Sequence, residues 1–136
     1  MFRFFQRHSH ISTLFLRLAV SMIFTYHGYL KLFGPNAPMK LVNRYVELGV
    51  PLPGLSAYLV GGAEFFCGLL IGLGMLTRWA SLILIGTMLF VIFVVFRGET
   101  YLHMEQSVQL LILVVGTLFS GSGSFSFENL VKKHGD

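Results

Sequence analysis

The chain has 136 residues, of which 54% are hydrophobic and 12% are charged, about half the charged share of a typical globular protein. Its net charge of +4 is small, and most basic residues lie at or beyond the ends of apolar runs, which excludes a nucleic-acid surface. A single cysteine, Cys67, excludes an internal disulfide and a CxxC redox pair. We therefore expect residues 1–136 to form one membrane-embedded, all-α unit, whose redox chemistry, if any, needs a bound cofactor or a partner.

The first apolar run follows basic residues and resembles a signal peptide in that respect. It contains Arg17, continues to Phe33 and lacks a small-x-small cleavage site. We interpret residues 12–33 as a retained first transmembrane helix.

This first helix carries four polar side chains that are unusual in a membrane. Arg17 begins more than one turn inside the span, which favours pairing with a buried acid over snorkelling towards the N-terminal side. Lys31 either snorkels to the interface or lies beside His27, four positions earlier on the helix. His27 either donates to a backbone carbonyl or, with Tyr26, binds a ligand headgroup.

A loop at residues 34–54 contains a helical pattern at residues 39–48. Its apolar positions share one face, while lysine, asparagine, arginine and glutamate occupy the other. This pattern predicts a short amphipathic helix at the membrane surface, between the first and second spans. It is either a lid over the bundle mouth or an ordinary surface helix.

Residues 55–76 form the second span, with Glu64 near its middle. A carboxyl group at that depth costs about 3 kcal/mol, so it is expected to face protein or water and to have a partner. Gly61, Gly68 and Gly72 lie on or near the same helical face. Small residues there predict that another helix comes close enough to supply the partner.

The third span, residues 79–96, has no charged residue and is expected to be a lipid-facing scaffold helix. A two-residue connection makes it antiparallel to the second span. The fourth span, residues 101–119, places Glu105 and Gln109 on one face near a membrane edge. Four spans put both termini on one side, and the distribution of lysine and arginine favours the cytoplasmic side.

We expect the first, second and fourth helices to converge around Glu64. The histidines lack metal-ligand spacing, and neither His27 nor His103 has an axial partner in register, so we expect no metal and no haem. The predicted proton-handling residues are Glu64 and Glu105, and the predicted ligand-binding residues are Arg17, Tyr26, His27, Lys31 and Gln109.

Three sequence segments occur in a familiar order and spacing. They are FLRLAVSMIFTYHGYLKLFG, then GVPLPG with GGAEFFCGLLIGLGMLTRWAS, and finally GSGSFSFENL. Together they resemble the DoxX-like family of small bacterial four-helix membrane proteins, over nearly the whole chain. The resemblance implies a multi-pass protein of the bacterial inner membrane. The family's recurring polar positions correspond here to Arg17, Lys31, Glu64 and Glu105.

The founding members of the family resemble subunits of a thiosulfate:quinone oxidoreductase, and others are linked to thiol or oxidative-stress assemblies. The resemblance therefore implies a redox-associated subunit, with a quinone or a small thiol-linked ligand in the bundle. Two positions depart from the family pattern. Cys67-Gly68 replaces a common Gly-Gly, and Phe96-Arg97 stands where a histidine is common, so His27 or His103 would have to take over that histidine's chemistry.

Two further functions remain open from the sequence. The polar residues also suit a non-enzymatic assembly or scaffold subunit, in which they only fix helix register. A small-solute transporter is the third alternative. Each predicts the lipid bilayer as a partner, together with a partner protein or a second copy of the chain.

Overall fold

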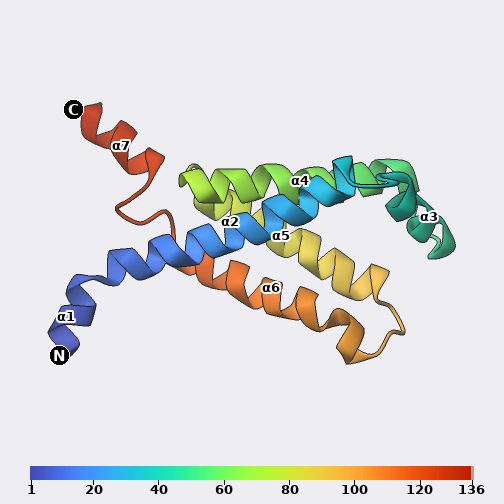
Figure 1. Cartoon of the computed structure of the whole chain (residues 1–136), viewed down its shortest axis with the longest axis horizontal. Coiled ribbons are helices and arrows are strands. Elements are labelled where there is room, and N and C mark those ends of the chain that lie inside the picture. The colour runs from blue at the N-terminus through green and yellow to red at the C-terminus, as the bar shows by residue number, and fades with distance from the viewer. Residues whose placement is uncertain (136) are drawn as a thin grey trace.

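A computed structural model describes residues 1–135, except for the side chain of Phe5, and in this part every regular element is a helix (Figure 1). The predicted all-α class is confirmed. Residue 136 of the predicted unit lies outside the described residues. The helices are α1 (Phe2–Arg7), α2 (Ser9–Phe33), α3 (Met39–Glu47), α4 (Pro53–Leu73), α5 (Thr77–Phe90), its π-helical continuation η1 (Val91–Val95), α6 (Tyr101–Ser120) and α7 (Phe127–His134).

The four long helical segments α2, α4, α5–η1 and α6 form a bundle. Helix α2 packs along α4, α4 on α5, α5 on α6, and α6 on α2, which closes the bundle. The short helix α3 packs on α4 at one end, and both chain termini lie at the opposite end (Figure 1). An even number of long helices brings the termini to one end.

Three helices are long and apolar enough to cross a membrane: Pro53–Leu73, Thr77–Val95 and Tyr101–Ser120. Helix α2, with 25 residues, is long enough but is not among them, and it carries Arg17 and Lys31. The structure thus supports three of the four predicted crossings.

Helix α4 begins and ends slightly earlier than the predicted second span. Pro53 lies in its first turn, where the missing backbone N–H is not needed. Gly74, with φ +74°, ends the helix in the left-handed conformation that glycine adopts without strain. The predicted continuation to Leu76 is wrong for this reason.

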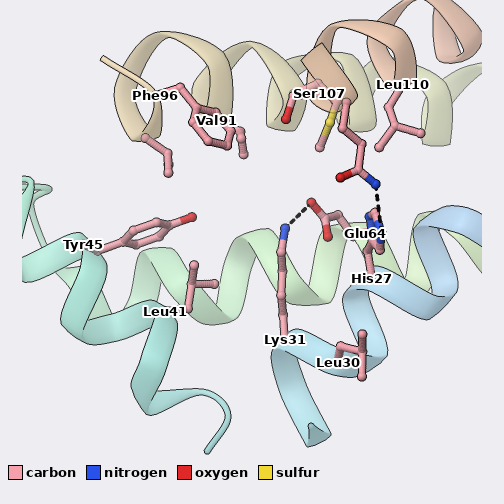
Figure 2. Close-up of a pocket in the computed structure, with 13 residues that line it drawn as sticks. His27, Leu30, Lys31, Leu41, Tyr45, Glu64, Val91, Phe96, Ser107 and Leu110 are labelled. Atoms are coloured by element: carbon pink, nitrogen blue, oxygen red, sulfur yellow. Dashed lines mark hydrogen bonds and ion pairs between the residues drawn. The ribbon is translucent and has the colours of Figure 1, made fainter. Parts of the chain in front are cut away.

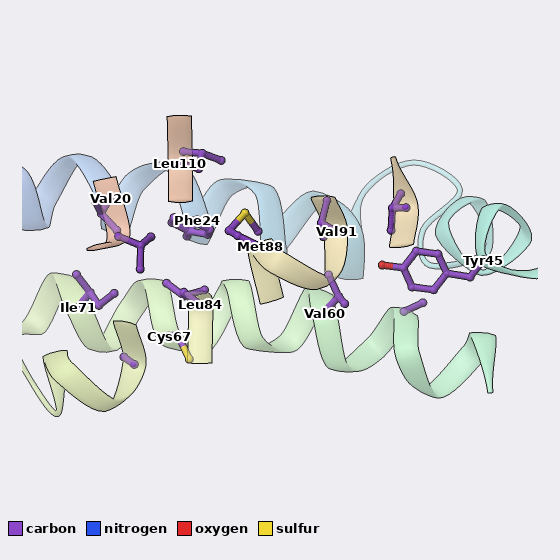
Figure 3. Close-up of a cluster of buried hydrophobic side chains, with 14 of the residues drawn as sticks. Val20, Phe24, Tyr45, Val60, Cys67, Ile71, Leu84, Met88, Val91 and Leu110 are labelled. Carbon is purple, nitrogen blue, oxygen red and sulfur yellow. The ribbon is translucent and has the colours of Figure 1, made fainter. Parts of the chain in front are cut away.

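The hydrophobic core lies along the middle of the bundle (Figure 3). Phe24 of α2, Ile71 of α4 and Leu84 of α5 are each fully buried in it. Cys67 is also buried and belongs to the same apolar cluster, where it packs as a small hydrophobic side chain.

Glycines allow α2 and α4 to cross closely. A Cβ atom on Gly28 would collide with the backbone N of Phe65 and lie 2.8 Å from the carbonyl O of Gly61. A Cβ atom on Gly68 would lie 2.8 Å from the backbone N of Thr25. The predicted close approach to the glycine face of α4 is confirmed, and the approaching helix is α2.

Substitution of Gly28 by alanine is therefore expected to lower the free energy of unfolding. The added methyl group meets backbone rather than flexible side chains, and overpacking of this kind costs about 1–3 kcal/mol. Gly62 is the matched control, because a Cβ atom there has nothing within 4 Å. Gly62→Ala should be neutral or gain up to about 1 kcal/mol from helix propensity. Thermal unfolding in one detergent compares the two, and equal effects would contradict the close crossing.

Candidate ligand site

Glu64 is buried, with 1% of its surface exposed, and its partner is a lysine (Figure 2). The Nζ atom of Lys31 lies 2.6 Å from Glu64 Oε1. The prediction that Glu64 meets a partner from another helix is confirmed. The prediction that Arg17 is paired with a buried acid is wrong, and Lys31 turns to Glu64 rather than to the interface.

The register of α2 against α4 explains this correction. The two helices are antiparallel neighbours, and Arg17 reaches the carbonyls of Ile71 and Gly72. Ile71 lies seven positions after Glu64, which is about 10 Å along a helix. Lys31, fourteen positions after Arg17, lies level with Glu64 instead.

Arg17 ties three parts of the chain together through backbone carbonyls. Its Nε donates to Ile71 O (3.1 Å) and its Nη2 to Gly72 O (3.0 Å), at the C-terminal end of α4. Its Nη1 donates to Ser122 O and Phe125 O, in the segment between α6 and α7. A cation suits this position, because the last carbonyls of a helix carry partial negative charge and lack intrahelical partners. Arg17 therefore stabilises the end of the bundle where the termini lie, by linking α2 to α4 and to the segment between α6 and α7.

A cavity of about 350 Å³ lies beside Glu64 (Figure 2). This volume falls within the range of small-molecule sites, and the mixture of apolar walls with a few polar groups is also typical of them. Every long helix and α3 contribute to its lining: His27, Leu30, Lys31, Leu41, Tyr45, Glu64, Met88, Val91, Val95, Phe96, Gln106, Ser107 and Leu110.

The polar groups of the cavity are incompletely paired. Glu64 Oε2 is buried and has no hydrogen-bond partner in the described part of the chain. Gln106 Nε2 lies 3.4 Å from His27 Nε2 and donates to it when that nitrogen carries no proton. The hydroxyl of Tyr45 points into the cavity (Figure 2). Burial, and to a lesser extent the charge of Glu64, raises the pKa of Tyr45 to about 12, so this hydroxyl stays protonated at neutral pH.

Of the predicted site residues, the structure brings His27, Lys31 and Glu64 together at the cavity and places the others elsewhere. Tyr26 is 61% exposed and lines a different groove, on the outer side of α2 and α4. Glu105 accepts a hydrogen bond from Gln109 Nε2 (2.9 Å), and neither lines the cavity. Each step along a helix turns a side chain by about 100°, so the neighbours of Tyr26 and Glu105, not these residues themselves, face Glu64.

The DoxX family model matches residues 12–97, which is more than half of the chain. The chain belongs to the DoxX family. The resemblance stated from the sequence motifs is confirmed, and the matched region contains Arg17, Lys31 and Glu64 but not α6. No curated protein and no solved structure matches this chain. Family membership and the three apolar helices together identify a membrane protein.

Sequence reasoning missed several residues of this DoxX protein's cavity. Tyr45 belongs to the apolar face of the predicted amphipathic helix at residues 39–48, and the need of a buried tyrosine hydroxyl for a polar partner is the signal that could have found it. Gln106 and Ser107 were missed because the face of α6 was assigned from Glu105. The π-helical segment η1, which presents Val91 and Val95 to the cavity, has no clear sequence signal, though such segments are frequent at functional sites.

Helix α3 is held across the end of the bundle by charged groups outside the apolar spans. Arg44 Nη2 lies 3.4 Å from Glu99 Oε1, and His103 Nδ1 lies 2.7 Å from Glu99 Oε2. The hydrogen bond from His103, followed by the charges of His103 and Arg44, lowers the pKa of Glu99. The predicted amphipathic helix is therefore present as α3, and through Tyr45 it forms part of the cavity wall.

Within the described residues, no three His, Cys, Asp or Glu side chains lie together in an arrangement that suits a metal ion. The polar groups of the cavity are a carboxylate, an ammonium, an imidazole, an amide and two hydroxyls. This set suits an organic headgroup that exchanges hydrogen bonds and protons.

Proposed function

We propose that this DoxX protein is a redox-associated membrane subunit that binds a quinone headgroup in the cavity beside Glu64. The observation that carries the proposal is the buried, unpartnered Oε2 of Glu64, a residue that lines an otherwise largely apolar cavity large enough for a small ring. Ionisable groups inside a membrane protein are expensive, and they mark ligand or proton pathways more often than not. We also propose that α2 is the fourth crossing helix and that both termini lie in the cytoplasm of a bacterial cell.

The chemistry of a quinone headgroup matches the lining of the cavity. Leu30, Val91 and Leu110 offer apolar walls to a flat ring. Lys31 and Tyr45 supply hydrogen-bond donors, and Glu64 can exchange protons with the bound ring. The reduction of a quinone takes up two electrons and two protons. In this proposal the chain handles the protons, and a partner protein supplies or removes the electrons.

Binding of a short-chain benzoquinone to the protein in lipid nanodiscs tests the proposal. A ligand that binds only the folded protein raises its stability by about 2.7 kcal/mol at a hundredfold excess over Kd, so the midpoint of thermal unfolding should rise. Tyr45→Phe should weaken binding about fivefold, since it removes one hydrogen bond worth about 1 kcal/mol. The matched control is Tyr58→Phe on the exposed face of α4, which should bind like the unmodified protein. No shift at any concentration of either the quinone or its quinol would contradict the proposal.

A non-enzymatic assembly subunit is the second candidate, and one observation favours it. The Lys31–Glu64 ion pair joins α2 to α4 without any ligand, as a pair that only fixes helix register would do. That function predicts that quinone does not bind and that an apolar or neutral replacement of both residues leaves a partner's assembly intact. Co-purification of partner proteins with such a double variant separates the two functions.

A further inference from the structure

The unpartnered atom Oε2 belongs to Glu64, which lines the cavity, and it is a hydrogen-bond acceptor. Glu64 forms an ion pair with Lys31, whose Nζ lies 2.6 Å from Oε1, and the carboxylate of such a pair accepts hydrogen bonds and cannot donate them. Oε1 receives the ammonium of Lys31, whereas Oε2 is buried with no donor in the described residues. The chemical requirement of this site is therefore a donor.

Oxidised and reduced quinones differ in whether they can donate a hydrogen bond. A quinone presents two carbonyl oxygens, which only accept, so a quinone oxygen placed against Glu64 Oε2 would set two acceptors against each other. A quinol presents two hydroxyl groups, which both donate and accept. A quinol hydroxyl is therefore complementary to Oε2, and a quinone oxygen is not.

Lys31 and Tyr45 can donate hydrogen bonds to the oxygen of the same quinol hydroxyl. Lys31 carries three N–H donors and spends one on Glu64 Oε1, and the hydroxyl of Tyr45 points into the same cavity (Figure 2). A quinol hydroxyl that donates to Glu64 can accept from either of these groups. Buried polar groups that are fully paired in this way avoid the cost of an orphaned acceptor.

We infer that the site is selective for the reduced quinol over the oxidised quinone, through hydrogen-bond donation from a quinol hydroxyl to Glu64 Oε2. The inference rests on the proposed quinone-binding function and adds the redox state of the preferred ligand. Tighter binding of the reduced form raises the midpoint potential of the bound couple, by about 30 mV for each tenfold difference in Kd. The protein would thus hold quinol at a potential where free quinol is already partly oxidised.

Separate dissociation constants for a short-chain benzoquinone and its quinol test this selectivity. The protein in nanodiscs is titrated with each form without oxygen, and binding to empty nanodiscs is subtracted. We expect the quinol to bind at least tenfold more tightly. The dimethyl ether of the quinol keeps the ring but cannot donate, so it should lose this advantage in the unmodified protein, and this arm needs no variant.

Glu64→Gln tests the role of the carboxylate itself. The amide keeps the shape of the side chain and can donate to a quinone oxygen, so the preference for quinol should vanish or reverse. Glu128→Gln on α7 is the matched control and should keep the preference, because Glu128 pairs with Lys132 away from the cavity.

The outcomes separate the inference from the proposed function. If neither redox form binds, the proposed function fails and the inference fails with it. If both forms bind equally, if the quinone binds more tightly, or if the dimethyl ether binds as well as the quinol, the cavity is a quinone site but the inferred selectivity is overturned.

Discussion

Substitution of Lys31 by methionine is expected to lower the free energy of unfolding by about 3–5 kcal/mol, because it leaves the buried carboxylate of Glu64 without its cation. Thermal unfolding in detergent measures the change. Lys40→Met is the matched control. Lys40 lies on the exposed face of α3, and its substitution should change stability by less than about 0.5 kcal/mol.

The double variant Lys31→Met/Glu64→Gln distinguishes a buried ion pair from two independent contributions. Removal of both charges also removes the desolvation cost of the orphaned carboxylate, so the double variant should be more stable than Lys31→Met alone. Strictly additive losses, or no loss in Lys31→Met, would show that the two side chains do not form the pair seen in the structure.

Substitution of Arg17 by methionine is expected to cost at least about 3 kcal/mol. It removes a guanidinium that donates to four carbonyls. The carbonyl of Gly72 at the end of α4 loses its donor, whereas that of Ile71 keeps the backbone N–H of Gly74. Arg17→Lys should recover only part of the loss, because an ammonium keeps the charge but lacks the planar fork that reaches several carbonyls at once. Arg97→Met, at an exposed position near the other end of the bundle, is the control and should have little effect.

Hydrogen–deuterium exchange locates the effect of the Arg17 substitution. The guanidinium also binds the carbonyls of Ser122 and Phe125, so exchange should accelerate in residues 121–130. Acceleration confined to the neighbourhood of Glu64 would instead support the original expectation that Arg17 serves the acidic site.

Local properties of the sequence were sufficient to predict much of this fold. The helices, the amphipathic α3 and the glycine face of α4 follow from periodicity and from residue size within single segments. The burial of Glu64 and its need for a partner follow from the cost of a charge in hydrocarbon. None of these predictions depends on how two helices are aligned.

Which cation pairs with Glu64 does depend on how α2 and α4 are aligned. Helix α2 offers Arg17 and Lys31, and the connection to α4 contains another helix, so the sequence does not determine which cation lies level with Glu64. The same limit applies to α6, where a rotation by one residue exchanges Glu105 for Gln106 at the cavity. Tyr45 reaches the site only because α3 folds across the end of the bundle.

The claim that Glu64 faces a ligand cavity inside the bundle is tested most directly by an experimental density map of the protein purified with its native lipids or saturated with a short-chain quinol. We expect Lys31 Nζ beside Glu64 Oε1 and density for a headgroup within hydrogen-bonding distance of Oε2. A side chain of residue 64 that points into lipid tails, or a cavity filled by the protein's own side chains, would contradict the claim.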